Sequence, residues 1–208
     1  LQLGGSAVHR ATEAMVHKAR RLAARLLEAD EADIVVDIAA GTVGVAGVPS
    51  SAFEWAALAL AAEQHADAVY HSGVTLGLAA QLDFDQGDAT FPFGAHIAVV
   101  EVDRDTGKVA VLRHIAVDDC GVVLNTLLVE GQQHGGVAAG VSQALYEHVR
   151  YDTDGNPLTA NFMDYAFPSA AEFPSFEVHS TQTPTPLNPL GAKGIGEAST
   201  IGSTPPWR

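Results

Sequence analysis

The sequence predicts an α+β fold, in which amphipathic helices pack on one face of mostly antiparallel sheets. Two kinds of pattern alternate along the 208 residues: apolar residues at helical spacing, and pairs of short Val- and Ile-rich runs separated by turn residues. With 47% apolar residues, the chain is long enough for one large domain or two small ones. We expect a break between two subdomains near Phe91.

The first half of the chain predicts two helices that flank a hairpin. We expect the first helix to begin after Ser6 as N-cap and to end near Asp30, because its apolar residues recur at spacings of three and four. These residues are Val8, Ala11, Met15, Ala19, Leu22 and Leu26. Two short strands follow within residues 33–46, and a capping box of Ser51 and Glu54 predicts a second, alanine-rich helix.

The second half predicts a longer hairpin, a helix and a strand. Residues 95–117 are rich in Val, Ile and Ala on both sides of a turn at residues 103–107, which is typical of an antiparallel pair. Asn125 is placed to cap a helix, and we expect an interruption or deformation of that helix at Gly135–Gly136. A Pro- and Ser-rich stretch follows, with one strand predicted around residues 176–181.

Charge and composition exclude several classes of function. The 25 acidic residues against 11 basic ones argue against a nucleic-acid partner, which would need a basic surface. The single Cys120 cannot form an internal disulfide, so we expect a reducing, cytoplasmic environment. No apolar run is long enough to span a bilayer. Because the chain does not begin with Met, we expect it to be a fragment of a longer protein.

A glycine-rich loop near the C-terminus, residues 188–200, is built to present one acid. Gly191, Gly194 and Gly196 allow other groups to approach the backbone closely, and Glu197 stands where helix-compatible residues resume. If a helix begins at Glu197, its free N–H groups and dipole stabilise the ionised carboxylate, which can then accept a proton. The alternative is a first-turn acid that only complements the helix dipole.

Other patterns carry less chemistry. The glycine spacing matches neither a dinucleotide fingerprint nor a phosphate-binding P-loop. None of the 9 histidines pairs with another His or Cys at a metal-ligand spacing, so no protein-ligated metal is expected. Asp118 and Asp119 are adjacent in a strand and point to opposite faces, so they cannot converge on one substrate. Cys120, with no basic neighbour, is interpreted as an inert thiol.

The segment of residues 130–136 places two glutamines beside three glycines within the predicted helix. A glutamine amide donates and accepts hydrogen bonds at once, which suits an oxo group or a heterocycle. The alternative interpretation is a solvent-facing polar turn of the helix.

Three segments, in order and spacing, resemble the xanthine oxidase family of molybdenum hydroxylases. They are Val117-Asp118-Asp119-Cys120-Gly121 with Leu124-Asn125, Glu130-Gly131-Gln132-Gln133-His134-Gly135-Gly136 with Gln143-Ala144-Leu145-Tyr146-Glu147, and Pro189-Leu190-Gly191 with Lys193-Gly194-Ile195-Gly196-Glu197 and Ile201-Gly202-Ser203-Thr204-Pro205-Pro206. The resemblance spans most of the chain. It implies the C-terminal portion, residues 1–208, of the second molybdopterin-binding domain of a catalytic large subunit.

The resemblance also assigns roles to four residues. It implies that Glu197 is the general base in hydroxylation of a small-molecule substrate with water as the oxygen source, at a molybdenum held by a molybdopterin dithiolene rather than by protein ligands. Gln132, Ile195 and Gly196 become cofactor contacts. Bacterial members generally carry the cytosine dinucleotide form of the cofactor, which is the form we expect.

Partners and substrate follow only from the resemblance. Iron–sulfur clusters and FAD are expected on partner subunits or domains of a hetero-oligomer, because no cysteine spacing here can ligate a cluster. The substrate stays open among aldehydes, purines, N-heterocycles and carbon monoxide. Segments that bind the rest of the cofactor would precede Leu1, so we expect the isolated chain to be catalytically inactive. The competing hypothesis is a non-catalytic structural or subunit-contact module with the same scaffold.

Overall fold

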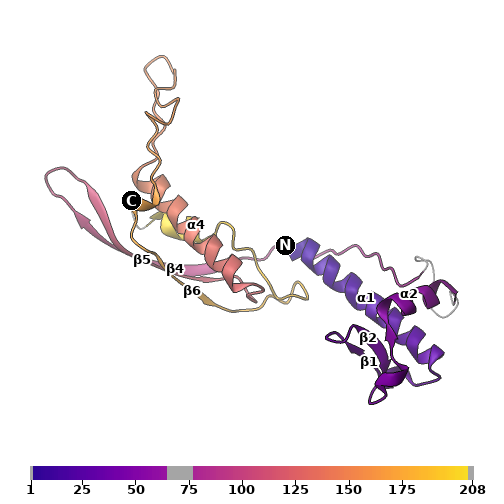
Figure 1. The fold of residues 1–208 in the computed structure, drawn as a ribbon. Helices are drawn as coiled ribbons and strands as arrows, with labels where there is room; N and C mark the ends of the chain where they lie inside the picture. Colours follow the sequence, from indigo (N-terminus) through magenta and orange to yellow (C-terminus); the bar gives the residue numbers. More distant parts are fainter. Residues whose placement is uncertain (1, 65–76, 206–208) are drawn as a thin grey trace. The chain divides into compact units, whose positions relative to one another are not determined.

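The structure, a computed structural model, describes residues 2–64 and 77–205 (Figure 1). The chain divides after Asp85 into two compact units, here called the N-terminal and the C-terminal unit. Each unit combines helices with one three-stranded sheet. The predicted α+β fold is therefore confirmed.

The N-terminal unit packs two helices with an antiparallel sheet of order β1-β2-β3. Its elements are α1 (Gln2–Leu26), η1 (Glu31–Asp33), β1 (Ile34–Asp37), β2 (Thr42–Val45), η2 (Pro49–Ser51), β3 (Phe53–Glu54) and α2 (Trp55–Gln64). The predicted hairpin within residues 33–46 is confirmed by the β1–β2 pair. Leu22 of α1, Val43 of β2 and Leu58 of α2 are fully buried and form the centre of the core.

Both helix starts predicted in this unit were wrong. The first helix begins at Gln2, so Ser6 lies inside α1 and is fully buried rather than capping it. Burial of a helix face outweighs the low helix propensity of glycines, which costs about 1 kcal/mol for each Gly. Ser51 and Glu54 form no capping box: Ser51 lies in η2, where its Oγ donates to Val48 O at 3.0 Å, and Glu54 belongs to β3.

The helix α1 ends with a left-handed residue that is not the usual glycine. The N–H of Ala29 donates to Ala24 O at 2.9 Å and that of Glu28 to Arg25 O at 3.4 Å, which are the two bonds of a Schellman motif. Glu28 takes the left-handed conformation with φ 51° that a glycine would adopt without strain. The helix therefore ends at Leu26, short of the predicted Asp30.

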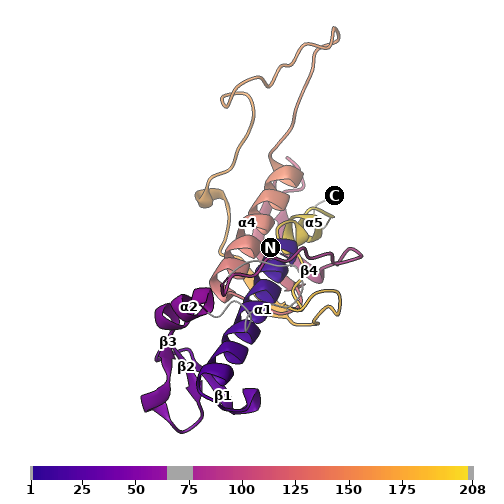
Figure 2. The same cartoon turned by 90° about the vertical axis from the view of Figure 1, so that its right-hand side faces the viewer.

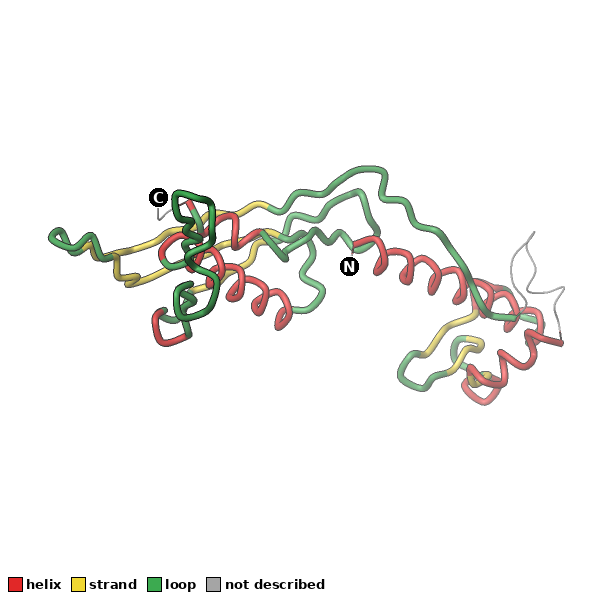
Figure 3. Tube along the Cα trace, turned by 90° about the horizontal axis from the view of Figure 1, so that it is seen from above, coloured by secondary structure: helices red, strands yellow, loops and turns green. Residues whose placement is uncertain are grey.

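The C-terminal unit is a sheet of order β4-β5-β6 with two helices. Its elements are β4 (Phe93–Val102), β5 (Val109–Asp119), α4 (Thr126–Leu145), η3 (Ala170–Glu172), β6 (Glu177–Thr181) and α5 (Ala198–Ser203). The predicted hairpin of residues 95–117 is confirmed, and β6 adds to β5 in parallel. Figure 3 shows the three strands side by side with α4 along them. Between α4 and β6 the chain extends as a long loop (Figures 1 and 2).

The helix α4 has the predicted cap but not the predicted interruption. Asn125 Oδ1 accepts from the Leu128 N–H at 3.1 Å, and the helix then runs without a break through Gly135 and Gly136. Gly136 and Gly140 instead allow α5 to pack closely against α4. A Cβ on Gly136 would lie 2.8 Å from Ser199 Cβ, and one on Gly140 would lie 2.0 Å from Ser203 Oγ.

This packing predicts opposite effects for two alanine substitutions on one helix. Gly140→Ala should destabilise the α4–α5 contact by roughly 1–3 kcal/mol, because the new methyl group overlaps Ser203 and the Thr200 carbonyl. Gly135→Ala, where nothing lies within 4 Å, should be neutral or stabilise by up to about 1 kcal/mol. Hydrogen exchange of α5 amides measures both. Equal protection in the two variants would contradict the close packing.

Candidate functional site

The four residues singled out by the sequence lie at one end of α5 and on the neighbouring face of α4. Glu197 is the N-cap of α5, as the predicted helix start requires; its side chain is exposed and makes no capping hydrogen bond. Gly196 is exposed and Ile195 is half-buried. Gln132 is exposed on α4.

Gln132 and Gly196 meet, although 64 positions separate their residue numbers. The Gln132 amide nitrogen lies 3.6 Å from the point where a Cβ on Gly196 would stand. Figure 2 shows α5 beside α4, which is the packing that brings the two residues together. The structure thus joins an amide side chain, a glycine backbone and an exposed carboxylate on one surface.

A buried carboxylate lies directly beneath this surface. Asp118 accepts hydrogen bonds from His96 Nε2 at 3.1 Å, from Gln133 Nε2 at 3.2 Å and from Ser199 Oγ. Burial raises the pKa of Asp118, but the hydrogen bonds from His96, Ser199 and Gln133 outweigh it, so the pKa is lowered overall. These four residues are called the Asp118 cluster below.

A second histidine extends the Asp118 cluster. His114 Nε2 lies 3.2 Å from His96 Nδ1, and the His114 side chain is fully buried. Burial, followed by the neighbouring His96, lowers the pKa of His114 to about 4, while Asp118 acts in the opposite direction. His114 is therefore neutral at neutral pH. The ionised Asp118 requires that His96 Nε2 carries the proton of their shared hydrogen bond.

Asp119 turns the other way and holds the glycine-rich loop. It accepts hydrogen bonds from the Gly121 N–H and from the Thr181 and Thr183 hydroxyls, and its Oδ1 lies 3.2 Å from Lys193 Nζ. Burial raises the pKa of Asp119, but these hydrogen bonds, with that of Gly121 largest, lower it well below its usual range. The two carboxylates contact separate sets of residues, as strand alternation predicts.

The loop is also clamped through its backbone. The Val122 N–H donates to Gly191 O at 3.0 Å, and the Lys193 N–H donates to Cys120 O at 2.6 Å. Gly121 has φ 71°, and a Cβ there would lie 2.2 Å from Gly191 O, so only glycine fits. Cys120 is buried, and burial raises the pKa of its thiol, which agrees with an inert role.

Sequence reasoning missed three residues of the Asp118 cluster: His96, Gln133 and Ser199. Each is a polar residue whose side chain is fully or almost fully buried. One feature of the sequence could have indicated the cluster: each strand of the Val-rich hairpin carries a histidine, His96 and His114. Buried polar side chains are nearly always hydrogen-bonded, so histidines in such strands indicate polar partners nearby. The family resemblance assigns a role to Gln132 and none to its neighbour Gln133.

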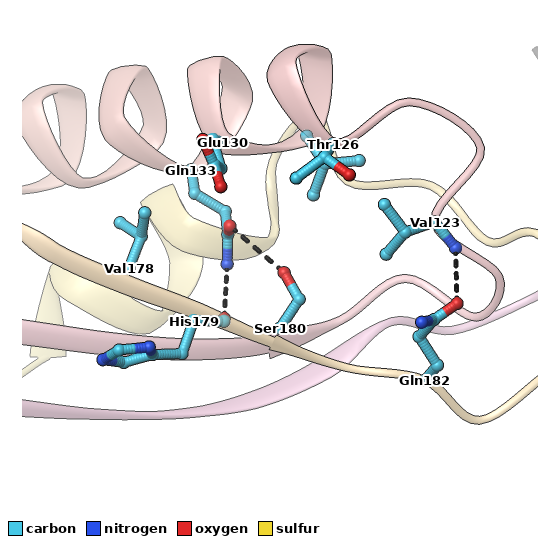
Figure 4. A pocket seen from close by; sticks show the side chains of 9 residues that line it. Val123, Thr126, Glu130, Gln133, Val178, His179, Ser180 and Gln182 are labelled. Carbon is cyan, nitrogen blue, oxygen red and sulfur yellow. Dashed lines mark hydrogen bonds between the residues drawn. The ribbon is translucent and has the colours of Figure 1, made fainter.

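A pocket of about 360 Å³ opens between the first turns of α4 and β6 (Figure 4). Gln133 forms its inner wall, donating to His179 O at 2.8 Å and accepting from Ser180 Oγ at 3.3 Å. Across the pocket, the Val123 N–H donates to Gln182 Oε1 at 2.9 Å. The lining residues are Val123, Thr126, Val129, Glu130, Gln133, Val178, His179, Ser180 and Gln182. None of the four residues predicted from sequence is among them.

Within residues 2–64 and 77–205, no group of three His, Cys, Asp or Glu side chains could hold a metal ion. Over the same part of the chain, no helix combines the length and apolar character needed to cross a membrane.

Comparisons with known proteins agree on one family. The model of the molybdopterin cofactor-binding domain family matches residues 1–174. The chain is 37% identical to the carbon monoxide dehydrogenase large chain of Afipia carboxidovorans, over 97% of this chain and 24% of that one. It is 38% identical to the 6-hydroxypseudooxynicotine dehydrogenase complex subunit gamma of Paenarthrobacter nicotinovorans, over 96% of this chain and 25% of that subunit.

A solved structure is similar over nearly the same extent. Quinoline 2-oxidoreductase from Pseudomonas putida 86 matches with a TM-score of 0.78 and 37% identity, covering 94% of this chain and 24% of that one. The chain therefore spans about a quarter of the length of these relatives.

The lowered pKa of His114 predicts a local loss of stability on mild acidification. Between the unfolded value of 6.5 and the folded value of about 4, the unfolded chain binds a proton that the folded chain does not. The stability gained by keeping His114 neutral is fully present above pH 6.5 and is lost as the pH falls toward 4. Hydrogen exchange of β4 and β5 amides, corrected for intrinsic rates, should show this loss.

The control compares two histidine substitutions. His114→Gln should flatten the pH dependence of exchange in β4 and β5, whereas His148→Gln, at an exposed side chain, should leave it as in the wild type. The pKa values of Asp118 and Asp119 are both lowered by their hydrogen bonds, so these carboxylates titrate below this window. A wild-type slope in the His114 variant would show that another group titrates there.

Proposed function

We propose that this chain, which belongs to the molybdopterin cofactor-binding domain family of the molybdenum hydroxylases, forms part of the catalytic large subunit of an oxidoreductase, with Glu197 as general base. The observation that carries the proposal is the meeting of Gln132 with Gly196 beside the exposed Glu197 carboxylate. Relatives of nearly equal identity are named for carbon monoxide, 6-hydroxypseudooxynicotine and quinoline. Identity alone therefore does not choose the substrate among aldehydes, purines, N-heterocycles and carbon monoxide.

The residues present fit a bound molybdopterin. Glu197 is exposed, and its side chain makes no capping hydrogen bond to its own helix, so its carboxylate can face a ligand. Gly196 presents backbone without a side chain, and the Gln132 amide beside it can donate and accept hydrogen bonds. Asp118 and Asp119 do not compete for the role of base, because both are buried and their hydrogen bonds hold the scaffold.

In this proposal, Glu197, Gln132, Gly196 and Ile195 each have a separate role beside the cofactor. When bound, the cofactor would supply the redox centre that accepts the electrons removed from the substrate. Glu197 would accept, at its carboxylate, the proton released as a water-derived oxygen becomes bonded to the substrate carbon. Gln132 would orient the cofactor with its amide, Gly196 would allow close approach, and the half-buried Ile195 would wall the site from water.

The remaining parts of the enzyme are proposed from the family. We expect the cytosine dinucleotide form of the cofactor, and iron–sulfur and flavin groups on partner subunits of a hetero-oligomer. The relatives' names, "large chain" and "complex subunit gamma", describe subunits of larger assemblies. A cytoplasmic location remains a prediction.

Substitution of the proposed base tests the assignment. In the full-length protein loaded with cofactor, Glu197→Gln should lower kcat by about 100-fold or more, because the amide cannot accept the proton. Molybdenum and pterin contents should stay at the wild-type level. Glu101→Gln, the same change at an exposed glutamate of β4, is the matched control and should leave kcat unchanged.

The assay uses an aldehyde, a purine, an N-heterocycle and carbon monoxide as substrates. A Glu197→Gln protein that retains its metal and turns over at the wild-type rate would exclude Glu197 as base. If the wild-type full-length protein acquires no molybdopterin in a cell that makes it, the non-catalytic scaffold hypothesis replaces the enzyme.

A further inference from the structure

We propose that Asp118 and Ser199 are positioning residues, which hold α5, and with it Glu197, in register with Gln132 on α4. The inference rests on the proposed function of Glu197 and concerns how the fold keeps that carboxylate in place. Neither residue is expected to touch substrate, because Asp118 is 2% exposed and Ser199 is fully buried.

The helix α5 is too short to be stable on its own. It has only six residues, from Ala198 to Ser203, and a helix of this length is unstable without tertiary contacts. Ser199 lies two positions after Glu197 and donates its hydroxyl proton to Asp118 Oδ2. This bond ties the first turn of α5, and therefore the backbone that carries Glu197, to the end of β5.

Asp118 also binds α4, the helix that carries Gln132. Gln133, the residue after Gln132, donates its amide to the same Oδ2 atom at 3.2 Å. Gln133 also donates to His179 O of β6 at 2.8 Å, which fixes the orientation of α4 over the sheet. One oxygen atom thus receives one donor from each of the two helices that carry Glu197 and Gln132.

The last turn of α5 also rests on the Asp118 cluster, through Gly202, which lies on nearly the same face of the helix as Ser199. A Cβ on Gly202 would lie 2.7 Å from His96 Nε2, and His96 donates from this atom to Asp118 Oδ1 at 3.1 Å. On the α4 side, Gly136 and Gly140 allow Ser199 and Ser203 to approach the helix. Movement of α5 would therefore break a buried hydrogen bond to a carboxylate, which costs more than an exposed one.

The test is a double-mutant cycle in the full-length holoprotein. Ser199→Ala removes the hydroxyl that donates to Asp118 and adds no volume. It should lower kcat about tenfold and leave KM within about twofold, because a small displacement of the base affects the reaction more than substrate binding. In the Glu197→Gln background the same substitution should cause no further loss, since the group that it positions is absent.

A second measurement does not depend on activity. Ser199→Ala should increase hydrogen exchange of α5 amides about tenfold, with molybdenum content unchanged, and Asp118→Asn should increase it at least as much. Ser169→Ala and Asp103→Asn are matched controls, since they remove a hydrogen-bonding Ser and Asp at a 3₁₀ turn and at the β4–β5 turn. Both should leave α5 exchange and kcat as in the wild type.

The outcomes separate the two proposals. If Glu197→Gln lowers kcat as predicted, two results would show that the positioning inference is wrong while the base assignment stands. One is that Ser199→Ala lowers kcat by the same factor in the wild-type and the Glu197→Gln backgrounds, and the other is that it leaves kcat unchanged in both. If Glu197→Gln leaves kcat unchanged, the base assignment itself fails. Unchanged α5 exchange in Ser199→Ala would also overturn the positioning inference, whatever the activity.

Discussion

The carboxylate of Asp118 is the constraint on which the C-terminal unit depends. A charge removed from water must find donors, and Asp118 takes them from three elements: His96 of β4, Gln133 of α4 and Ser199 of α5. Loss of any one donor would leave part of a buried charge unsatisfied. The need to supply hydrogen-bond donors to the Asp118 carboxylate therefore constrains how the helices pack on the sheet. Apolar packing around Ala116, Val137 and Val141 adds to this constraint.

Two adjacent aspartates serve two different connections because a strand alternates its side chains. Asp118 faces the helices, while Asp119 binds Lys193 and the Thr181 and Thr183 hydroxyls on the side of the glycine-rich loop. The Lys193 ammonium also lies 4.7 Å from the centre of the Phe93 ring. The loop is thus held at Lys193 and the helix at Ser199, and the exposed Glu197 lies between these two attachments.

Features that depend on neighbouring residues alone could be predicted from the sequence. The β4–β5 hairpin, the Asn125 cap and the helix start at Glu197 follow from alternation, turn residues and capping preferences within a few residues. The Asp118 cluster could not be predicted in this way, because Ser199 and Asp118 are 81 positions apart. The same limit explains the error at Gly135–Gly136: glycine signals a break locally, but here Gly136 admits a neighbouring helix. Burial of Ser6 likewise overrides its capping preference.

Glu197 and Gln132 are proposed to face one bound cofactor. The most direct measurement is a crystal structure of the full-length protein isolated with its molybdopterin. We expect the Gln132 amide to form a hydrogen bond to the cofactor and the Glu197 carboxylate to point to its molybdenum centre, with the Asp118 hydrogen bonds intact beneath them. A cofactor bound elsewhere, with Glu197 and Gln132 turned to solvent, would contradict it.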